Sequence, residues 1–240
     1  MHILPIRSES PETNMALDLL LLKSYPEPEI PRFRHYGWSL PTWTFGYSQK
    51  WSIKHDIIRD LAAHIIRRPT GGGLVDHLHD WTYSLVIPPS NHLFREKAVL
   101  SYKTIHEALT EALKTNGSTA VVKPSEETQN KIVNSSIPDT LSSSDICFEH
   151  PEVYDVVHEN GAKIAGAAQK RSREGLLFQG SINRQAVDVM NWGAFLETFC
   201  SELSTAMGTS QKKVDFPRFD PKKIEELNEK FNSEDWNRQR

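Results

Sequence analysis

The chain has 240 residues and a formal net charge of −3, with a low hydrophobic fraction of 38% and an ordinary charged fraction of 25%. This length suffices for one large domain with its own core, and the composition predicts a globular enzyme with polar loops or tails. The slight negative charge argues against a nucleic-acid partner, since proteins that bind nucleic acid usually carry a strong basic excess.

The compartment is indicated by the cysteine count and the N-terminal segment. The chain has two cysteines, Cys147 and Cys200, so we expect no disulfide framework and a reducing environment. Residues 1–13 lack the apolar core of a signal peptide, and the apolar run at 19–22 is too short to span a bilayer. The sequence therefore predicts a soluble cytoplasmic protein without a membrane partner.

The N-terminal part predicts a helix followed by strands. Asn14 is the expected cap of a helix over residues 14–22, which should be buried because leucines occupy nearly every face. Prolines then end this helix, and aromatic residues alternate with polar ones in the strand-like stretches 32–38 and 43–47. A short helix is expected over residues 52–63.

A glycine-rich loop follows that helix. Arg67 and Arg68 enter the loop, and their planar guanidinium groups suit carboxylate or phosphate groups. Three consecutive glycines can adopt positive φ angles and let backbone amides approach a ligand closely, which predicts a binding loop. The alternative is a flexible hairpin with solvated arginines. The three glycines are Gly71, Gly72 and Gly73.

The middle of the chain predicts a strand, a helix and a long polar segment. The strand-like run 81–87 is followed by an amphipathic helix over residues 101–114, in which His106 should be solvated or take part in capping. Residues 124–146 show no helix or strand period, which is typical of a mobile loop or a functional lid. A plain surface insertion is an equal alternative.

A hairpin is predicted after that polar segment. Asn160 and Gly161 form the strongest local turn signal, because both can take the positive φ angles of a type I′ turn. Lys163 then begins a strand of unusually small residues, which leave room for a ligand to lie against it. Those residues are Ala165, Gly166, Ala167 and Ala168.

The C-terminal part predicts a strand over residues 176–182 and a helix capped by Asn191, with Cys200 in or beside its apolar face. We expect one catalytic domain over residues 1–209. Residues 210–240 form a charged tail with one short helix, which either docks on the domain or is disordered.

Residues 67–84 and 163–171 together resemble the lipoate–protein ligase and octanoyltransferase family, relatives of the biotin–protein ligases. The family pattern has two arginines, three glycines, a Val-x-His and a Tyr-Ser, and later a Lys-x-x-Gly-x-Ala-Gln followed by arginine. The resemblance implies an α+β fold, class II synthetase-like, with a mixed, largely antiparallel central sheet packed by helices. It also implies these substrate-binding residues: Arg67, Arg68, Gly71, Gly72, Gly73, His77, Gly166 and Ala168.

The family joins an octanoyl or lipoyl group to a lysine of a lipoyl domain. In the route that we favour, Cys147 takes the acyl group from acyl carrier protein as a thioester, and Lys163 polarises the carbonyl. The acceptors implied by the resemblance are lipoyl domains of 2-oxoacid dehydrogenases or the glycine cleavage H protein. A buried, inert thiol is the alternative for Cys147.

Two other functions remain open at the level of sequence. An ATP-dependent lipoate or octanoate ligase of the same fold would need ATP and Mg²⁺, whereas the transferase needs no cofactor. Tyr154-Asp155 replaces the Asn-Asp pair typical of such ligases, and too few residues follow the last core helix for a further domain. The third alternative is a non-catalytic protein that binds lipoyl domains or acyl carrier protein.

His77 and His79 are spaced as the start of a metal site, but no third ligand stands at a recognisable spacing, so we predict no metal. We expect His77 to order the glycine loop or the substrate, and His79 to lie on the surface. Asp76 replaces the apolar residue usual in the family, which predicts a less well sealed pocket wall.

Overall fold

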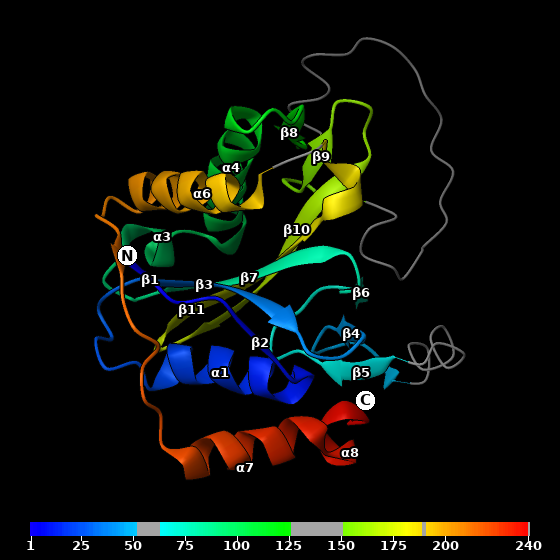
Figure 1. The fold of residues 1–240 in the computed structure, drawn as a ribbon, viewed down its shortest axis with the longest axis vertical. Helices are drawn as coiled ribbons and strands as arrows, with labels where there is room; N and C mark the ends of the chain where they lie inside the picture. Colours follow the sequence, from blue (N-terminus) through cyan, green and yellow to red (C-terminus); the bar gives the residue numbers. More distant parts are fainter. Residues whose placement is uncertain (52–62, 126–150, 189–190, 240) are drawn as a thin grey trace.

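The computed structural model describes residues 1–51, 63–125, 151–188 and 191–239 (Figure 1). Nine of the described strands form one mixed sheet, in the order β12-β1-β3-β7-β11-β10-β9-β8, with β2 also paired to β3. The strands are β1 (His2–Ile3), β2 (Arg7–Glu9), β3 (Arg32–Trp38), β7 (Asp80–Ile87), β8 (Ala120–Val122), β9 (Val156–His158), β10 (Lys163–Ser172), β11 (Gly175–Asn183) and β12 (Lys212–Lys213).

The predicted mixed, largely antiparallel sheet is confirmed. Its central strands β3, β7, β11 and β10 pair antiparallel, while β1, β2 and β12 add parallel pairs at one side. A second, small sheet has the order β5-β4-β6 and carries the glycine loop between two of its strands. Its strands are β4 (Thr42–Phe45), β5 (His64–Arg67) and β6 (Val75–Asp76).

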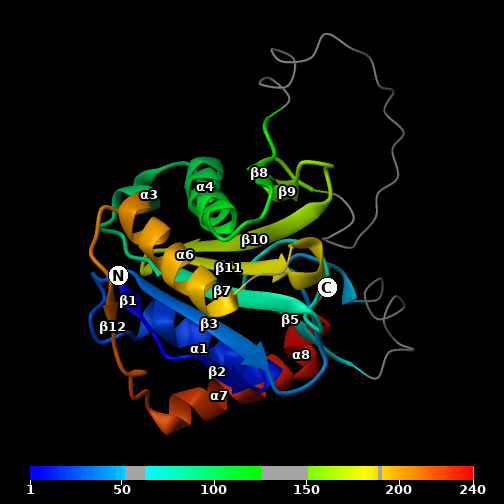
Figure 2. The same cartoon turned by 45° about the horizontal axis from the view of Figure 1, so that its top comes forward.

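Helices cover both faces of the large sheet (Figures 1 and 2). On one face α4 (Ala98–Thr115), α6 (Trp192–Ala206) and the short α3 (His92–Arg95) enclose the larger apolar core. On the other face α1 (Pro11–Lys23) packs against the sheet and is itself covered by α7 (Pro221–Asn232). Two further short helices in the described part of the chain are η1 (Arg184–Ala186) and α8 (Glu234–Asn237).

The first helix starts earlier than predicted, and Asn14 is not its cap. Ser10 caps α1, with its Oγ accepting from the amide N of Thr13, and Pro11 occupies the first turn. Asn14 is instead fully buried within the helix, and its amide donates to the carbonyl of Gly37 at 2.9 Å. The polar side chain that suggested a cap therefore joins the helix to β3.

The hairpin at Asn160 and Gly161 is present, but its turn type was predicted wrongly. Only Gly161 has a positive φ, +88°, whereas a type I′ turn needs positive φ at both central residues. The amide N of His158 donates to the carbonyl of Ala162, so the loop between β9 and β10 is longer than two residues. The strand after it, β10, begins at Lys163 as predicted.

The C-terminal segment lies against the domain. Residues 212–213 pair with β1 at the sheet edge, and α7 then packs on α1. Phe231 is fully buried in the apolar cluster of that helix. The division of the chain at residue 209 stays a prediction.

Several predicted features fall outside the described residues: the helix over 52–63 apart from residue 63, the polar loop 124–146 after residue 125, and Cys147. Among the helices that the structure describes, none combines the length and the apolar character needed to cross a bilayer.

Candidate functional site

A pocket of about 110 Å³ lies between the small sheet and strands β3, β7, β10 and β11 of the large one. Six of the predicted site residues line it: Arg68, Gly72, His77, Lys163, Gly166 and Ala168. Arg67, Gly71 and Gly73 are not among the lining residues, and Cys147 is outside the described part of the chain. Two motifs that are about a hundred residues apart in sequence thus meet at one cavity.

Lys163 is held at the pocket wall by a buried ion pair. Its Nζ lies 2.7 Å from Oδ2 of Asp155, and both side chains are almost fully buried. The same carboxylate accepts from the amide N of Glu152 at 2.7 Å and from the hydroxyl of Tyr102. Because three donors surround it, the Asp155 carboxylate has a fixed position, and it orients the ammonium group that pairs with it.

The pairing of β10 with β9 is irregular where this ion pair forms, with a register shift between Lys163 and Ala165. Lys163 and Gly166 both line the pocket, and a Cβ on Gly166 would crowd the end of the lysine side chain. The small residue at 166 therefore makes room for Lys163 as well as for a ligand.

His106 was wrongly predicted to be solvated or to act in capping. It is fully buried, and its Nδ1 lies 2.7 Å from the carbonyl O of Tyr154. Burial lowers the pKa of His106 to about 4, so the ring is neutral at pH 7 and its Nδ1–H donates to that carbonyl. Tyr154 itself has a positive φ of +68°, which is uncommon for a residue other than glycine.

Arg68 holds the glycine loop from within. Its guanidinium donates to the carbonyl O atoms of Gly71 and Gly73 at 2.9 and 2.8 Å, and to Oγ1 of Thr44 at 2.6 Å. Gly72, at the middle of the loop, has a φ of +83°, and a Cβ atom there would lie 3.2 Å from Nη2 of Arg68 and 3.4 Å from Cβ of Ala168. The loop that the sequence predicted to bind a ligand is therefore held by hydrogen bonds to its own arginine.

Gly46 allows the small sheet to contact this loop. A Cβ at Gly46 would lie 2.0 Å from the carbonyl O of Gly72, a distance that no side chain could tolerate. The amide N of Tyr47 also donates to the carbonyl of Thr70 at 2.8 Å. The turn after β4 thus packs directly on the glycine loop.

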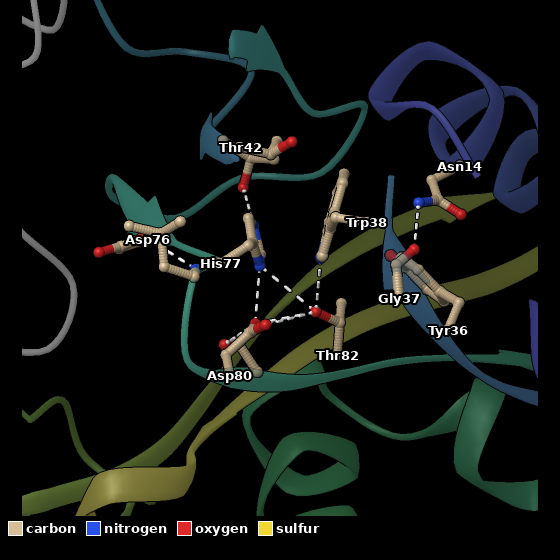
Figure 3. A network of polar contacts seen from close by, with 12 residues as sticks. Asn14, Tyr36, Gly37, Trp38, Thr42, Asp76, His77, Asp80 and Thr82 are labelled. Atoms are coloured by element: carbon tan, nitrogen blue, oxygen red, sulfur yellow. Dashed lines mark hydrogen bonds and ion pairs between the residues drawn. The ribbon is translucent and has the colours of Figure 1, made fainter. Parts of the chain in front are cut away.

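His77 lines the pocket and binds the side chain that accepts from Arg68 of the glycine loop. Figure 3 shows its other side, where it lies beside Asp80, Thr82 and Trp38. Its Nε2 lies 2.7 Å from Oγ1 of Thr44, which also accepts from Arg68. Its Nδ1 lies 2.7 Å from Oδ2 of Asp80, and its ring contacts that of Trp38 with a centroid distance of 4.3 Å. The hydrogen bonds therefore run from Asp80 through His77 and Thr44 to the arginine of the loop.

The neighbours of His77 point away from this chain of contacts. The carboxylate of Asp76 accepts from the amide N of Leu78 at 2.9 Å and is not among the groups that line the pocket. His79 is exposed, as predicted. Within the described residues, no group of three or more His, Cys, Asp or Glu side chains could hold a metal ion.

Arg67 faces away from the pocket and binds the C-terminal segment. Its guanidinium donates to the carbonyl O atoms of Trp236 and Asn237 at 3.0 and 2.8 Å, and to those of Tyr47 and Gln49 at 2.7 Å each. Its amide N donates to Oδ1 of Asn237, and the indole of Trp236 donates to its carbonyl O. Arg67 is fully buried by these contacts, so it acts as a brace behind the loop.

A buried polar network that the sequence did not indicate connects α1 to the glycine loop. The carboxylate of Asp18 pairs with the guanidinium of Arg34 at 3.1 Å, and the amide of Gln179 donates to it at 2.7 Å. The amide oxygen of Gln179 accepts in turn from the hydroxyl of Thr70, next to the first glycine of the loop. The only sequence signal was an acidic residue among the leucines of α1.

Cys200 is not a candidate nucleophile. It is buried within α6, as predicted, and burial raises the pKa of its thiol to about 12. The thiolate form that a nucleophile needs is therefore scarce at pH 7.

The comparison with known proteins agrees with these features. The lipoyl protein ligase A/B catalytic domain matches residues 10–229. The octanoyltransferase LipM of Anoxybacillus flavithermus is 34% identical over 178 residues, which are 72% of this chain and 61% of that protein. The LipM of Lysinibacillus sphaericus is 35% identical over 176 residues, 72% and 62% of the two chains. The chain thus spans less than two thirds of the length of these relatives.

A solved structure shows the same fold. The bi-partite lipoate protein ligase from Thermoplasma acidophilum superimposes with a TM-score of 0.71 at 18% identity, over 98% of this chain and 95% of the other. At this low identity the likeness concerns the fold, and it confirms the fold class expected from the sequence.

Proposed function

Because this chain belongs to the lipoyl protein ligase A/B catalytic domain family, we propose that it is an octanoyltransferase, which moves an octanoyl or lipoyl group from acyl carrier protein to a lysine of a lipoyl domain. The proposal is supported by the two relatives named octanoyltransferase LipM. The structural observation that supports the proposal most is a pocket whose wall contains the buried, ion-paired Lys163.

The reaction proceeds in two steps through Cys147. The thiolate attacks the carbonyl carbon of the donor thioester, a new thioester forms on Cys147, and the carrier leaves as its own thiolate. The lysine amine of the lipoyl domain then attacks this thioester, forms the amide, loses a proton and releases the Cys147 thiolate. Glu152 lines the pocket five residues after Cys147, and five residues span at most about 18 Å.

Lys163 stabilises the charge that develops in both steps. Each attack places negative charge on the acyl carbonyl oxygen, and an ammonium group fixed in a buried pocket stabilises that oxygen without having to reorganise. Asp155 keeps the ammonium in place between turnovers.

The acyl chain lies along the small residues of β10, with Gly166 and Ala168 at its side and Gly72 opposite. Arg68 and His77 maintain the shape of the glycine-loop wall, together with the outer loop residues Gly71 and Gly73, whose carbonyl groups bind the arginine. Arg67 contributes from behind that wall. Lipoyl domains of 2-oxoacid dehydrogenases and the glycine cleavage H protein are the acceptors to test.

The experiment that tests this function measures octanoylation of a lipoyl domain with two donors in parallel. Octanoyl-acyl carrier protein without ATP is expected to modify the domain, and free octanoate with ATP and Mg²⁺ is not. The reverse pattern would replace the transferase by an ATP-dependent ligase. Binding of the lipoyl domain without modification from either donor would leave a non-catalytic binding protein.

A further inference from the structure

We propose that Tyr102 is a positioning residue for acyl transfer, because its hydroxyl holds Asp155 and, through Asp155, the ammonium group of Lys163. The inference rests on the proposed function, in which Lys163 stabilises the reacting carbonyl. Tyr102 comes from α4, a helix that carries neither of the two family motifs.

The hydroxyl of Tyr102 makes two hydrogen bonds at the pocket. It donates to Oδ1 of Asp155, while Lys163 binds Oδ2 of the same carboxylate. It also accepts from the amide N of Ala167 at 3.0 Å. One phenol therefore ties the carboxylate to β10, the strand from which the lysine projects.

The phenol is suited to be a permanent donor. Burial raises the pKa of Tyr102 well above its ordinary value, and the charge of Asp155 raises it further. The hydroxyl therefore keeps its proton at neutral pH. Its donor role does not change during a reaction in which other groups gain and lose protons.

His106, one turn further along α4, binds the preceding residue of the same segment. Its Nδ1–H donates to the carbonyl of Tyr154, and its ring lies 4.1 Å from that of Tyr102 between centroids. Two side chains of one helix face thus hold two consecutive residues, Tyr154 and Asp155. The first of these two residues, Tyr154, has an uncommon positive φ of +68°.

Removing the hydroxyl of Tyr102 would break its hydrogen bonds to Asp155 and to the amide N of Ala167. The Asp155 carboxylate would keep its bonds to Lys163 and to the amide of Glu152, but its Oδ1 atom would lose the hydrogen bond that links it, among the described residues, to β10 through Tyr102. The amide of Ala167 would lose its acceptor at the pocket wall. The ion pair would survive, in a position less well defined relative to the acyl carbonyl.

The test is a single-turnover measurement of octanoyl transfer from octanoyl-acyl carrier protein to the enzyme, followed by intact mass, for Tyr102→Phe. We expect the rate at saturating donor to fall on the order of 10- to 100-fold, because a misplacement of about 1 Å can cost ~100-fold. The donor concentration for half-maximal rate should remain the same. A lower rate at an unchanged half-maximal donor concentration distinguishes the loss of a positioning residue from a loss of folded protein or of donor binding.

Tyr83→Phe is the matched control. Tyr83 is fully buried and, like Tyr102, has its ring beside that of Phe178, but its hydroxyl has no hydrogen-bond partner among the described residues. Its removal should leave the rate within about twofold of the unchanged enzyme, since no hydrogen bond is lost.

A second pair of variants tests whether Tyr102 acts through the lysine. In a Lys163→Ala background, Tyr102→Phe should cause no further loss, because the group that it positions is absent. Equal rates for Tyr102→Phe and Tyr83→Phe, or full additivity with Lys163→Ala, would overturn the inference. Failure of the unchanged enzyme to take up octanoate would instead refute the proposed function, and the inference with it.

Discussion

A Cβ atom on Gly166 would lie 2.9 Å from Cε and 3.0 Å from Nζ of Lys163. The same atom would be 3.2 Å from Oδ1 of Asp155. The bare Cα at position 166 thus lets the lysine fold back along its own strand to reach its carboxylate partner. The glycine belongs to the motif because it accommodates the ion pair, and not only because it leaves room for an acyl chain.

Gly166→Ala should therefore impair catalysis without unfolding the protein. The crowded atoms are at the flexible end of a lysine, so the side chain can move away, and we expect only a small change in the melting temperature. The displaced ammonium should reduce the rate of acyl transfer by ~100-fold. Rate and thermal melt are measured on the same sample.

Gly193→Ala provides the control, since Gly193 is exposed in the first turn of α6 and lies away from the pocket. Its rate and melt should match those of the unchanged protein. If Gly166→Ala retained full activity, the proposed placement of Lys163 in catalysis would be wrong.

Asn237→Ala should destabilise the domain by about 1–3 kcal/mol, the usual cost of leaving a buried polar group without its partner. Its side chain accepts from the buried amide N of Arg67 at 2.8 Å and also donates to the carbonyl of Phe231. Urea unfolding gives the free energy directly. Asn232→Ala, at an exposed position of the same segment, should stay within about 0.5 kcal/mol of the unchanged protein.

The same variant tests whether the C-terminal segment supports the pocket. If it does, the half-maximal donor concentration should rise for Asn237→Ala at a temperature where the protein is still folded. If both the unfolding free energy and the donor dependence were unchanged, the contacts between Arg67 and the C-terminal segment would be dispensable.

Stability should fall on acidification between about pH 6.5 and pH 4. Burial lowers the pKa of His106 and that of His35 to about 4 each, so the folded state resists protonation in this window. The unfolded chain binds protons at an ordinary histidine pKa of about 6.5, which shifts the equilibrium toward unfolding. Above pH 6.5 both states are neutral at these positions, and the contribution is constant.

The measurement is the free energy of unfolding in urea at a series of pH values. Each histidine adds at most about 1.4 kcal/mol per pH unit to the loss. His106→Asn, which keeps a donor close to Nδ1 but cannot be protonated, should show a shallower decline with acid. An identical slope for this variant would contradict the assignment to His106.

Particular residues show how much of the fold and of the site could be predicted from the sequence. The glycine loop and the Lys163 strand were recognisable because each is a short motif with unusual composition, and the structure brings them together. The helix around Tyr102 was predicted from its apolar period. Nothing in that period indicated that Tyr102 and His106 face residues 154–155, because such contacts depend on how the hairpin packs.

Arg67 shows why the roles of other residues around the pocket could not be predicted from the sequence. Beside three glycines, an arginine is typical of a ligand site, whereas its partners Trp236 and Asn237 are about 170 residues away in sequence. Asn14 gave a similar false signal, since a buried amide bound to β3 and a helix cap look alike in sequence. In each case a long-range hydrogen bond determined the role, and no local pattern encodes it.

The measurement that tests the account most directly is the intact mass of the protein after mixing with octanoyl-acyl carrier protein in the absence of ATP, beside a Cys147→Ser sample. We predict an octanoyl adduct that hydroxylamine removes, that is absent from Cys147→Ser, and that is lost when a lipoyl domain is added. No adduct on the unchanged protein, together with octanoylation of the domain by free octanoate and ATP, would contradict the thioester route.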